Sequence, residues 1–319
     1  MNVDGAFAIY QGRVNADKTQ MAEARRRRSL FVSALMGDRD VVEVKPSGSL
    51  ARGTQKRPIH DVDLLVVFDR DEHPQWGNRG DSAKGALDHL QTRIRELLGT
   101  AGSFAEGEVR LTRWRNHAVK CFLDDPDDHN AFTVDATPAL RDGDRFLIPE
   151  ATNNCWVPTD PQLLIDEVAA RHHEWDKYAG TARMLKAWAA TQPTKIKSLV
   201  IEVLALDHLP TGRLRPVAIK EFFAGAAYQI ESGKIPTDPA GICGEIQHDL
   251  DLTEFAECLR VASNGSARAC HAQAQGDDHR AVQQWGFVFG ADFPAPPSTT
   301  PAVPPVVVPP RPVKDTPQG

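Results

Sequence analysis

The stretch from Pro46 to Phe68 reads P-S-G-S-L-A-R-G-T-Q-K-R-P-I-H-D-V-D-L-L-V-V-F. The stretch begins with a small-residue turn, Gly48-Ser49. It ends with an apolar run that has Asp61 and Asp63 at its start. Because side chains alternate between the faces of a strand, the two carboxylates project from the same face. Adjacent carboxylates repel each other unless a cation lies between them, and hard divalent cations prefer oxygen ligands. The stretch therefore predicts a strand with a divalent metal site next to a phosphate-binding turn.

The composition is that of an ordinary globular protein. The chain has 319 residues, of which 41% are apolar and 25% charged, and a formal net charge of −6. This charge gives no general reason to expect binding to duplex nucleic acid. The five cysteines are scattered without a C-x-x-C pair, which argues against a disulfide framework and a zinc ribbon. With no apolar run of transmembrane length and no signal-peptide pattern, we expect a reduced, cytoplasmic protein that does not enter a membrane.

The pattern of apolar residues divides the chain into a mixed α/β part and a helical part. In the first part we expect helices over 16–36 and 81–98, and strands over 41–44, 61–69, 107–113, 118–123 and 130–136. The turn Arg115-Asn116-His117 indicates a hairpin between the third and fourth of these strands. In the second part we expect helices over 161–175, 180–191, 197–208, 217–232, 252–273 and 277–289. The fold class is therefore α+β.

Several motifs have a plainer interpretation than the one they first suggest. Gly48 to Thr54 has the glycine spacing of a Walker A loop but lacks its lysine, so we reject a P-loop. His60-Asp61 resembles half of a metal-phosphohydrolase pair, but it opens a strand rather than lying on a helix. The run Arg25–Arg28 and the triplet His172-His173-Glu174 are typical of solvated helix faces, the former with one or two arginines in salt bridges.

A third carboxylate, Asp135, follows in the strand-like segment F-T-V-D-A-T-P. Alone, it would be interpreted as a turn carboxylate at a strand end. Together with Asp61 and Asp63, it supplies the further ligand that phosphoryl transfer with two metal ions requires. Gly48 allows close approach of the backbone, and Ser49 offers a hydroxyl and an N–H group to phosphate at a helix N-terminus.

These motifs resemble the nucleotidyltransferase superfamily that includes DNA polymerase β, and more narrowly the bacterial CD-NTases, relatives of cyclic GMP–AMP synthase and oligoadenylate synthase. G-S-L-A-R-G-T with D-V-D-L-L-V-V-F carries the broad resemblance, and F-T-V-D-A-T-P-A-L, A-R-M-L-K-A-W and K-S-L-V-I-E carry the narrow one. The resemblance implies a bilobal, polymerase β-like fold in which Asp135 is the third catalytic aspartate. It also implies that Lys186 and Ser198 contact the triphosphate.

By resemblance, residues 1–159 form the catalytic lobe, with an N-terminal helix packing across the lobes, and residues 160–293 form a helical lobe. The implied activity is a cyclic di- or trinucleotide synthase that uses nucleoside triphosphates such as ATP and two Mg²⁺ ions, with Mn²⁺ as a substitute. The product would be a second messenger for a separate effector in CBASS anti-phage signalling. A linear oligoadenylate or RNA-end nucleotidyltransferase and a catalytically idle nucleotide-binding scaffold remain alternatives.

Two further expectations concern partners. The chain lacks the zinc-binding insertion and the positive platform of the animal relatives, so we do not expect stable DNA binding. Residues 294–319 are rich in proline, which predicts a disordered, partly polyproline-II tail. This tail resembles the termini of family members that an E1-like ligase conjugates to a target, and a merely solubilising tail is the alternative.

Overall fold

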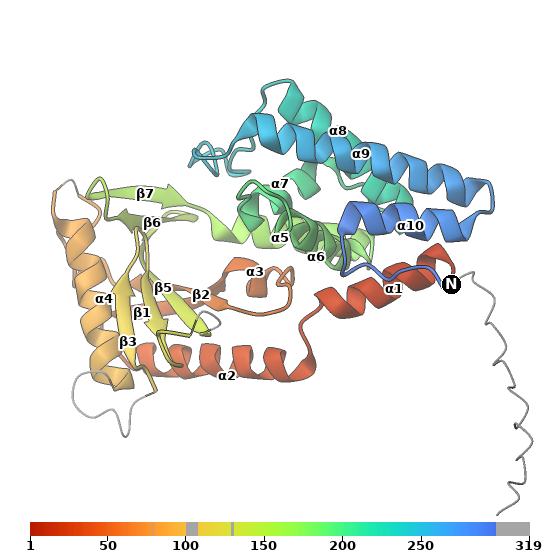
Figure 1. Ribbon diagram of the computed structural model, residues 1–319. Helices are drawn as coiled ribbons and strands as arrows, with labels where there is room; N and C mark the ends of the chain where they lie inside the picture. The colour runs from red at the N-terminus through yellow and green to blue at the C-terminus, as the bar shows by residue number, and fades with distance from the viewer. Residues whose placement is uncertain (79, 100–107, 129–130, 298–319) are drawn as a thin grey trace, which may run out of the picture.

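The computed structural model describes residues 1–78, 80–99, 108–128 and 131–297, which form two lobes (Figure 1). One lobe contains a mixed sheet against which helices α2 (Lys18–Leu35) and α4 (Ser82–Leu98) pack. The other lobe is a bundle of helices. The α+β, bilobal architecture predicted from the sequence is therefore confirmed.

The sheet places two strands that carry aspartates side by side. Its strands are β1 (Val41–Ser47), β2 (Asp61–Phe68), β3 (Leu111–Trp114), β4 (Val119–Phe122), β5 (Thr133–Asp142), β6 (Arg145–Glu150) and β7 (Cys155–Thr159). Their order is β1-β2-β5-β4-β3, and β6 pairs with both β5 and β7. The β2–β5 pair is parallel and the other pairs are antiparallel.

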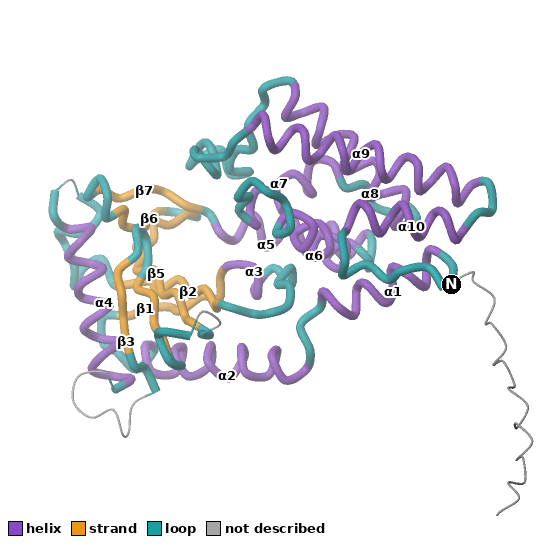
Figure 2. The backbone as a smooth tube through the Cα atoms, in the orientation of Figure 1, coloured by secondary structure: helices purple, strands orange, loops and turns teal. Residues whose placement is uncertain are grey.

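The second lobe collects helices from both ends of the described chain. They are α1 (Val3–Val14), α5 (Pro161–Glu174), α6 (Tyr178–Ala189), α7 (Ser198–His208), α8 (Arg215–Glu231), α9 (Leu252–Ala274) and α10 (Asp278–Phe289). The short helix α3 (Gly48–Ala51) links β1 to β2 and, with the loop that follows it, lies between the sheet and the helical lobe (Figure 2). Among the described residues, no helix combines the length and hydropathy needed to cross a membrane.

Each lobe has its own apolar core. In the sheet lobe, alternate residues of β2 such as Val62 and Leu64 are buried against Phe31 of α2 and Leu90 of α4. In the helical lobe, α1 contributes aromatic rings to the core, with Phe7 5.1 Å from the ring of Trp285. The predicted alternation along β2 is confirmed, and it leaves Asp61 and Asp63 on the face away from Val62 and Leu64.

The structure contains elements that the sequence pattern did not predict. Helix α1 includes Gly5 and Gly12, which lower helix propensity, so its burial against the helical lobe stabilises it instead. Strands β6 and β7 each contain a proline, a residue that argues against a strand in sequence analysis. The β5–β6 turn relies on Gly143, whose φ of +61° is accessible to glycine at little cost.

The other predicted elements appear with small shifts in their ends. The hairpin is formed by β3 and β4, but β3 begins at Leu111, so residues 108–110 of the predicted strand lie outside it. Strand β5 starts at Thr133 and continues to Asp142, six residues beyond the predicted end at 136. Positions 107 and 130, and the tail from residue 298, lie outside the described residues.

Candidate active site

The three predicted aspartates lie on the two central strands of the sheet. Asp61 and Asp63 are at the start of β2, and Asp135 is near the start of β5. In the parallel pairing, Asp63 is the register partner of Asp135, and Asp61 is the partner of Thr133. Because neighbouring strands are about 4.8 Å apart and side chains at paired positions share a face, the carboxylates of Asp63 and Asp135 lie next to each other.

This crowding of carboxylates changes their proton affinity. Burial, reinforced by the charges of Asp61 and Asp135, raises the pKa of Asp63 to about 7. Burial also raises the pKa of Asp135, although the ammonium group of Lys120 opposes the shift. Lys120 on β4 is the register partner of Asp135, and its Nζ lies 3.8 Å from Oδ1 of that residue. The site thus concentrates negative charge that a bound cation would neutralise.

Gly48 allows the turn before α3 to approach this cluster. Its φ is +65°, in the left-handed region that favours glycine. A Cβ atom at this position would lie 1.6 Å from Oδ2 of Asp63, far closer than any van der Waals contact. Glycine is therefore required both by the conformation of the turn and by the nearness of the carboxylate. Ser49 follows in α3 and lines the adjacent cleft.

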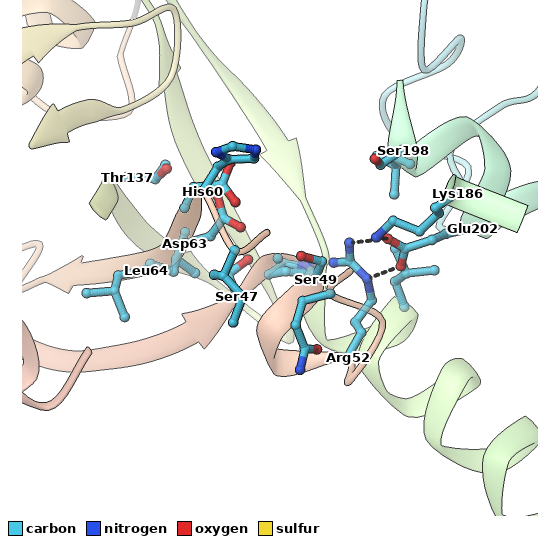
Figure 3. A pocket seen from close by; sticks show the side chains of 18 of the residues that line it. Ser47, Ser49, Arg52, His60, Asp63, Leu64, Thr137, Lys186, Ser198 and Glu202 are labelled. Atoms are coloured by element: carbon cyan, nitrogen blue, oxygen red, sulfur yellow. Dashed lines mark hydrogen bonds and ion pairs between the residues drawn. The ribbon is translucent and has the colours of Figure 1, made fainter. Parts of the chain in front are cut away.

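The cleft lies between the two lobes and has a volume of about 560 Å³. Figure 3 shows Ser47, His60 and Asp63 on the side of the sheet lobe, and Lys186, Ser198 and Glu202 on the helices opposite. Asp61 and Asp63 line the cleft, and Asp135 lies one strand further along the sheet. The cleft therefore brings together residues from both halves of the sequence.

Lys186 lines the cleft from α6, but its side chain is only 2% exposed and is hydrogen-bonded. Its Nζ donates to the backbone oxygen of Thr54 at 2.9 Å and to Oε1 of Glu202 at 2.6 Å. Burial lowers the pKa of Lys186, while the charge of Glu202 opposes the shift. An ammonium group has three N–H donors, and these two bonds use two of them.

Glu202 connects the two lobes. Its carboxylate accepts hydrogen bonds from Nε of Arg52 at 2.7 Å and from the hydroxyl of Thr54 at 2.8 Å, in addition to the bond from Lys186. Burial alone would raise the pKa of Glu202, but the two cations together hold it below its ordinary value. This buried network fixes the loop after α3, and with it Gly48 and Ser49, against helices α6 and α7.

Ser198 is the first residue of α7 and is exposed in the cleft. The N–H groups of the first turn of a helix have no partner within the helix, and the helix dipole favours negative charge there. Ser198 therefore lies where phosphate oxygens would be stabilised. The positively charged residues that line the cleft are Arg52, Lys56 and Lys186.

The aspartate cluster fits divalent metal ions. Oδ1 of Asp135 is buried without a hydrogen-bond partner among the described residues, and the ammonium group of Lys120, 3.8 Å away, is too distant to donate one. All of the donors are carboxylate oxygens, the ligands that Mg²⁺ and Mn²⁺ prefer. Asp61, Asp63 and Asp135 are the residues that would hold such ions.

Sequence reasoning did not identify Lys120, Arg52 or Glu202. The sequence does contain a signal for two of them, because a charged residue interrupts an apolar segment: Lys120 in A-V-K-C-F and Glu202 in S-L-V-I-E-V-L. Their partners are set by strand order and by the packing of the lobes, which no local pattern reveals. For the arginine run, the predicted salt bridges are confirmed, since Arg26 and Arg27 pair with Glu23. The predicted solvated face holds for Arg25 and Arg26 but not for Arg27, which is buried and also bonds Asp124.

Comparisons with known proteins agree with this architecture. Residues 31–100 match the model of the nucleotidyltransferase domain family. A probable cyclic nucleotide synthase of Bacillus cereus (strain VD146) is 23% identical over 325 residues, covering 88% of this chain and 94% of that protein. The cyclic AMP-AMP-AMP synthase of Escherichia coli (strain MS 115-1) is 25% identical over 232 residues, covering 67% of each. The structure of E. coli MS115-1 CdnC with ATP superposes with a TM-score of 0.69 at 20% identity, covering 92% of this chain and 99% of that chain.

Proposed function

Because this chain is a nucleotidyltransferase with the bilobal fold of the CD-NTases, we propose that it is a cyclic oligonucleotide synthase. In the reaction, a ribose hydroxyl of one nucleotide attacks the α-phosphorus of a second nucleoside triphosphate, the bond to the β-phosphate breaks, and pyrophosphate leaves. The observation that carries the proposal is the parallel pairing of β2 with β5. This pairing sets Asp63 beside Asp135 next to a cleft that the helical lobe covers.

The cleft offers groups that suit a triphosphate. Gly48 and Ser49 present a turn and a hydroxyl next to the aspartates, while Ser198 presents a helix N-terminus from the opposite side. Lys186 lines the cleft with an ammonium group that is paired with Glu202. These groups would bind the phosphates of the donor nucleotide and orient its α-phosphorus toward the aspartates.

Asp61, Asp63 and Asp135 would hold two Mg²⁺ ions, with Mn²⁺ as a substitute. When bound, these ions supply charge neutralisation on the phosphates and lower the pKa of the attacking hydroxyl. Burial raises the pKa of Asp135, which increases the proton affinity of its carboxylate and suits it to accept the proton of that hydroxyl.

A cyclic product requires the linear intermediate to stay in the cleft for a further transfer, in which its own ribose hydroxyl attacks its own triphosphate end. The names of the relatives from B. cereus and E. coli support a cyclic product, and the E. coli name supports adenine among its bases. We propose a cyclic di- or trinucleotide made from nucleoside triphosphates that include ATP.

The biological role follows from the same resemblance. The product would act as a second messenger in CBASS anti-phage signalling in the bacterial cytoplasm, where a separate effector recognises it. Conjugation of the proline-rich tail by an E1-like ligase is a separate proposal, because residues 298–319 lie outside the described chain. Neither proposal affects the chemistry assigned to the cleft.

Pyrophosphate release from a mixture of nucleoside triphosphates and Mg²⁺ tests the proposed chemistry. We expect Asp63→Asn and Asp135→Asn to lower the rate at least about 100-fold, since each removes a ligand charge worth several kcal/mol in the transition state. Asp142→Asn is the matched control, because this exposed residue lies at the far end of β5. Equal rates in all three variants would show that the aspartate pair does not carry the reaction.

A further inference from the structure

A second cluster of metal-binding side chains lies in the sheet lobe, at the end of β2 opposite to Asp61. Asp40 precedes β1, His73 is in the loop after β2, and His89 is on α4. Nε2 of His73 lies 2.9 Å from Oδ2 of Asp40, and Nε2 of His89 lies 2.8 Å from the same oxygen. The ligand atoms of all three residues lie within 4.8 Å of one another, a convergence found at no other such group among the described residues.

Hydrogen bonding alone does not satisfy this cluster. Both imidazoles contact Oδ2 of Asp40, whereas Oδ1 is buried and has no hydrogen-bond partner among the described residues. The Asp40 side chain is 9% exposed, so solvent does not readily replace that partner. A carboxylate buried in this way is stabilised by a cation that both of its oxygens can reach.

The surroundings favour a small, well-ordered site. The ring of Trp76 stacks on His73 with centroids 3.8 Å apart, and the ring of Phe68 lies 5.6 Å from His73 and 5.5 Å from His89. These aromatic rings fix the imidazoles and form an apolar shell around the charged ligands. His89 is 31% exposed, which leaves a path for a metal ion and for a water ligand.

We propose that Asp40, His73 and His89 form a binding site for one divalent transition-metal ion of the zinc class. Two imidazole nitrogens and a carboxylate are a ligand set that suits Zn²⁺ better than Mg²⁺ or Ca²⁺. Tetrahedral zinc with bonds of about 2.0–2.1 Å keeps its ligand atoms roughly 3.3 Å apart, so the distances of 2.9 and 2.8 Å from the two imidazoles to Asp40 need to lengthen by only roughly 0.5 Å. Water completes the coordination on the exposed side.

The bound ion would have a structural role that is independent of the nucleotide cleft. Its three ligands come from separate segments, so it would cross-link the start of β1, the loop after β2 and α4. Asp61 and Phe68 are the first and last residues of β2, and a strand of this length separates the two sites by roughly 20 Å. Loss of the ion would therefore loosen α4 without removing a ligand of the proposed catalytic ions.

Cobalt binding tests the site directly. Tag-free protein is stripped with a chelator and titrated with Co²⁺, whose visible absorption is strong in a tetrahedral nitrogen–oxygen site and weak in an octahedral carboxylate site. We expect about one equivalent of the strongly absorbing species per chain, displaced by Zn²⁺. The same signal must persist in the Asp61→Asn, Asp63→Asn protein, because the catalytic cluster does not produce it.

The informative variants are His73→Gln and His89→Gln, because glutamine keeps an N–H donor for Asp40 but is a poor zinc ligand. We expect each to lose the cobalt signal, to bind Zn²⁺ at least about 100-fold more weakly, and to melt at a temperature that Zn²⁺ no longer raises. The double variant His172→Gln, His173→Gln changes two exposed residues of α5; it is the matched control and should behave like the wild type.

Two results would overturn the proposal. One is the absence of the strong absorption in the wild-type protein, which would show that the cluster is held by hydrogen bonds alone. The other is an unchanged signal in each glutamine variant that folds, which would place the metal elsewhere. Circular dichroism establishes that each variant is folded, and a single folded glutamine variant is sufficient to decide between these outcomes.

Discussion

Replacing Gly48 with alanine should separate the geometry of the site from the stability of the fold. The added Cβ would lie 1.6 Å from Oδ2 and 2.4 Å from Cγ of Asp63, whereas ordinary van der Waals contact begins at 3.4 Å. Either the carboxylate or the turn must therefore move by about 1.8 Å or more. Asp63 lies beside Asp135 in the sheet, so the displacement would disturb the arrangement on which the proposed chemistry depends.

The expected losses in rate and in stability differ in size. A misplacement of about 1 Å in an active site can cost on the order of 100-fold in rate, so Gly48→Ala should lower kcat at least about 100-fold. The left-handed backbone of this residue adds a cost of about 1–2 kcal/mol in the free energy of unfolding. Pyrophosphate release measures the first quantity, and urea denaturation measures the second.

Gly53→Ala is the matched control for this experiment. Gly53 lies in the same loop with a φ of +67°, but a Cβ there would have no atom within 4 Å. We expect a similar loss of about 1–2 kcal/mol in stability, with the rate retained within roughly threefold. If Gly48→Ala were as active as Gly53→Ala, the close approach of the turn to Asp63 would not be needed for catalysis, and the reasoning would be refuted.

Three other substitutions probe the supports of the site. Arg27→Met should lower the free energy of unfolding by about 2 kcal/mol, because it leaves Phe132 O and the half-exposed Asp124 without their guanidinium partner. The Arg27 guanidinium holds the pKa of Asp124 below its ordinary value. The stability that the Arg27–Asp124 pair contributes is therefore fully present above the unfolded pKa of about 3.9, and it is lost as the pH falls through the folded pKa. Glu202→Gln should cost about 3–5 kcal/mol in urea denaturation, because it leaves two buried cations unpaired. Ser198→Ala should raise KM for nucleotide about fivefold at unchanged kcat, since one hydrogen bond is worth about 1 kcal/mol.

The two stability predictions each have a control on an exposed residue. Arg25→Met in the same helix and Glu231→Gln at the end of α8 should change the free energy of unfolding by less than about 0.5 kcal/mol. Arg27→Met fails as a prediction if its deficit relative to the wild type is the same at pH 7 and at pH 3. A tenfold fall in kcat of Ser198→Ala, at constant KM, would assign that residue to the chemical step rather than to binding.

The sequence was most informative for those residues of the site that lie close together in the chain. Gly48, Ser49, Asp61 and Asp63 lie within one short segment, and strand alternation alone predicts that the two aspartates share a face. The pairing of Asp135 with Asp63 depends on a parallel strand arrangement that no spacing encodes. The family resemblance implied that Asp135 is the third aspartate, and the register of β2 and β5 shows its pairing with Asp63.

The remaining features depend on tertiary structure. Lys186 could be placed near the cleft by resemblance, but its bond to Glu202 follows from the packing of α6 on α7 and of both on the loop after α3. Asp40, His73 and His89 are separated by 33 and 16 residues and form no recognisable metal-binding motif. Helix α1 is stable because of the aromatic core that it joins, in which Phe7 contacts Trp285 from the other end of the described chain.

The central claim is that this cleft joins nucleotides into a ring, and the product itself tests it most directly. The protein is incubated with all four labelled nucleoside triphosphates and Mg²⁺ or Mn²⁺, the mixture is treated with phosphatase, and the surviving material is analysed by mass spectrometry. A ring has no terminal phosphate, so the account predicts a phosphatase-resistant product with the mass of two or three linked nucleoside monophosphates, absent from the Asp61→Asn, Asp63→Asn protein. A product that phosphatase converts entirely to linear species ending in a free 5′-hydroxyl would contradict it.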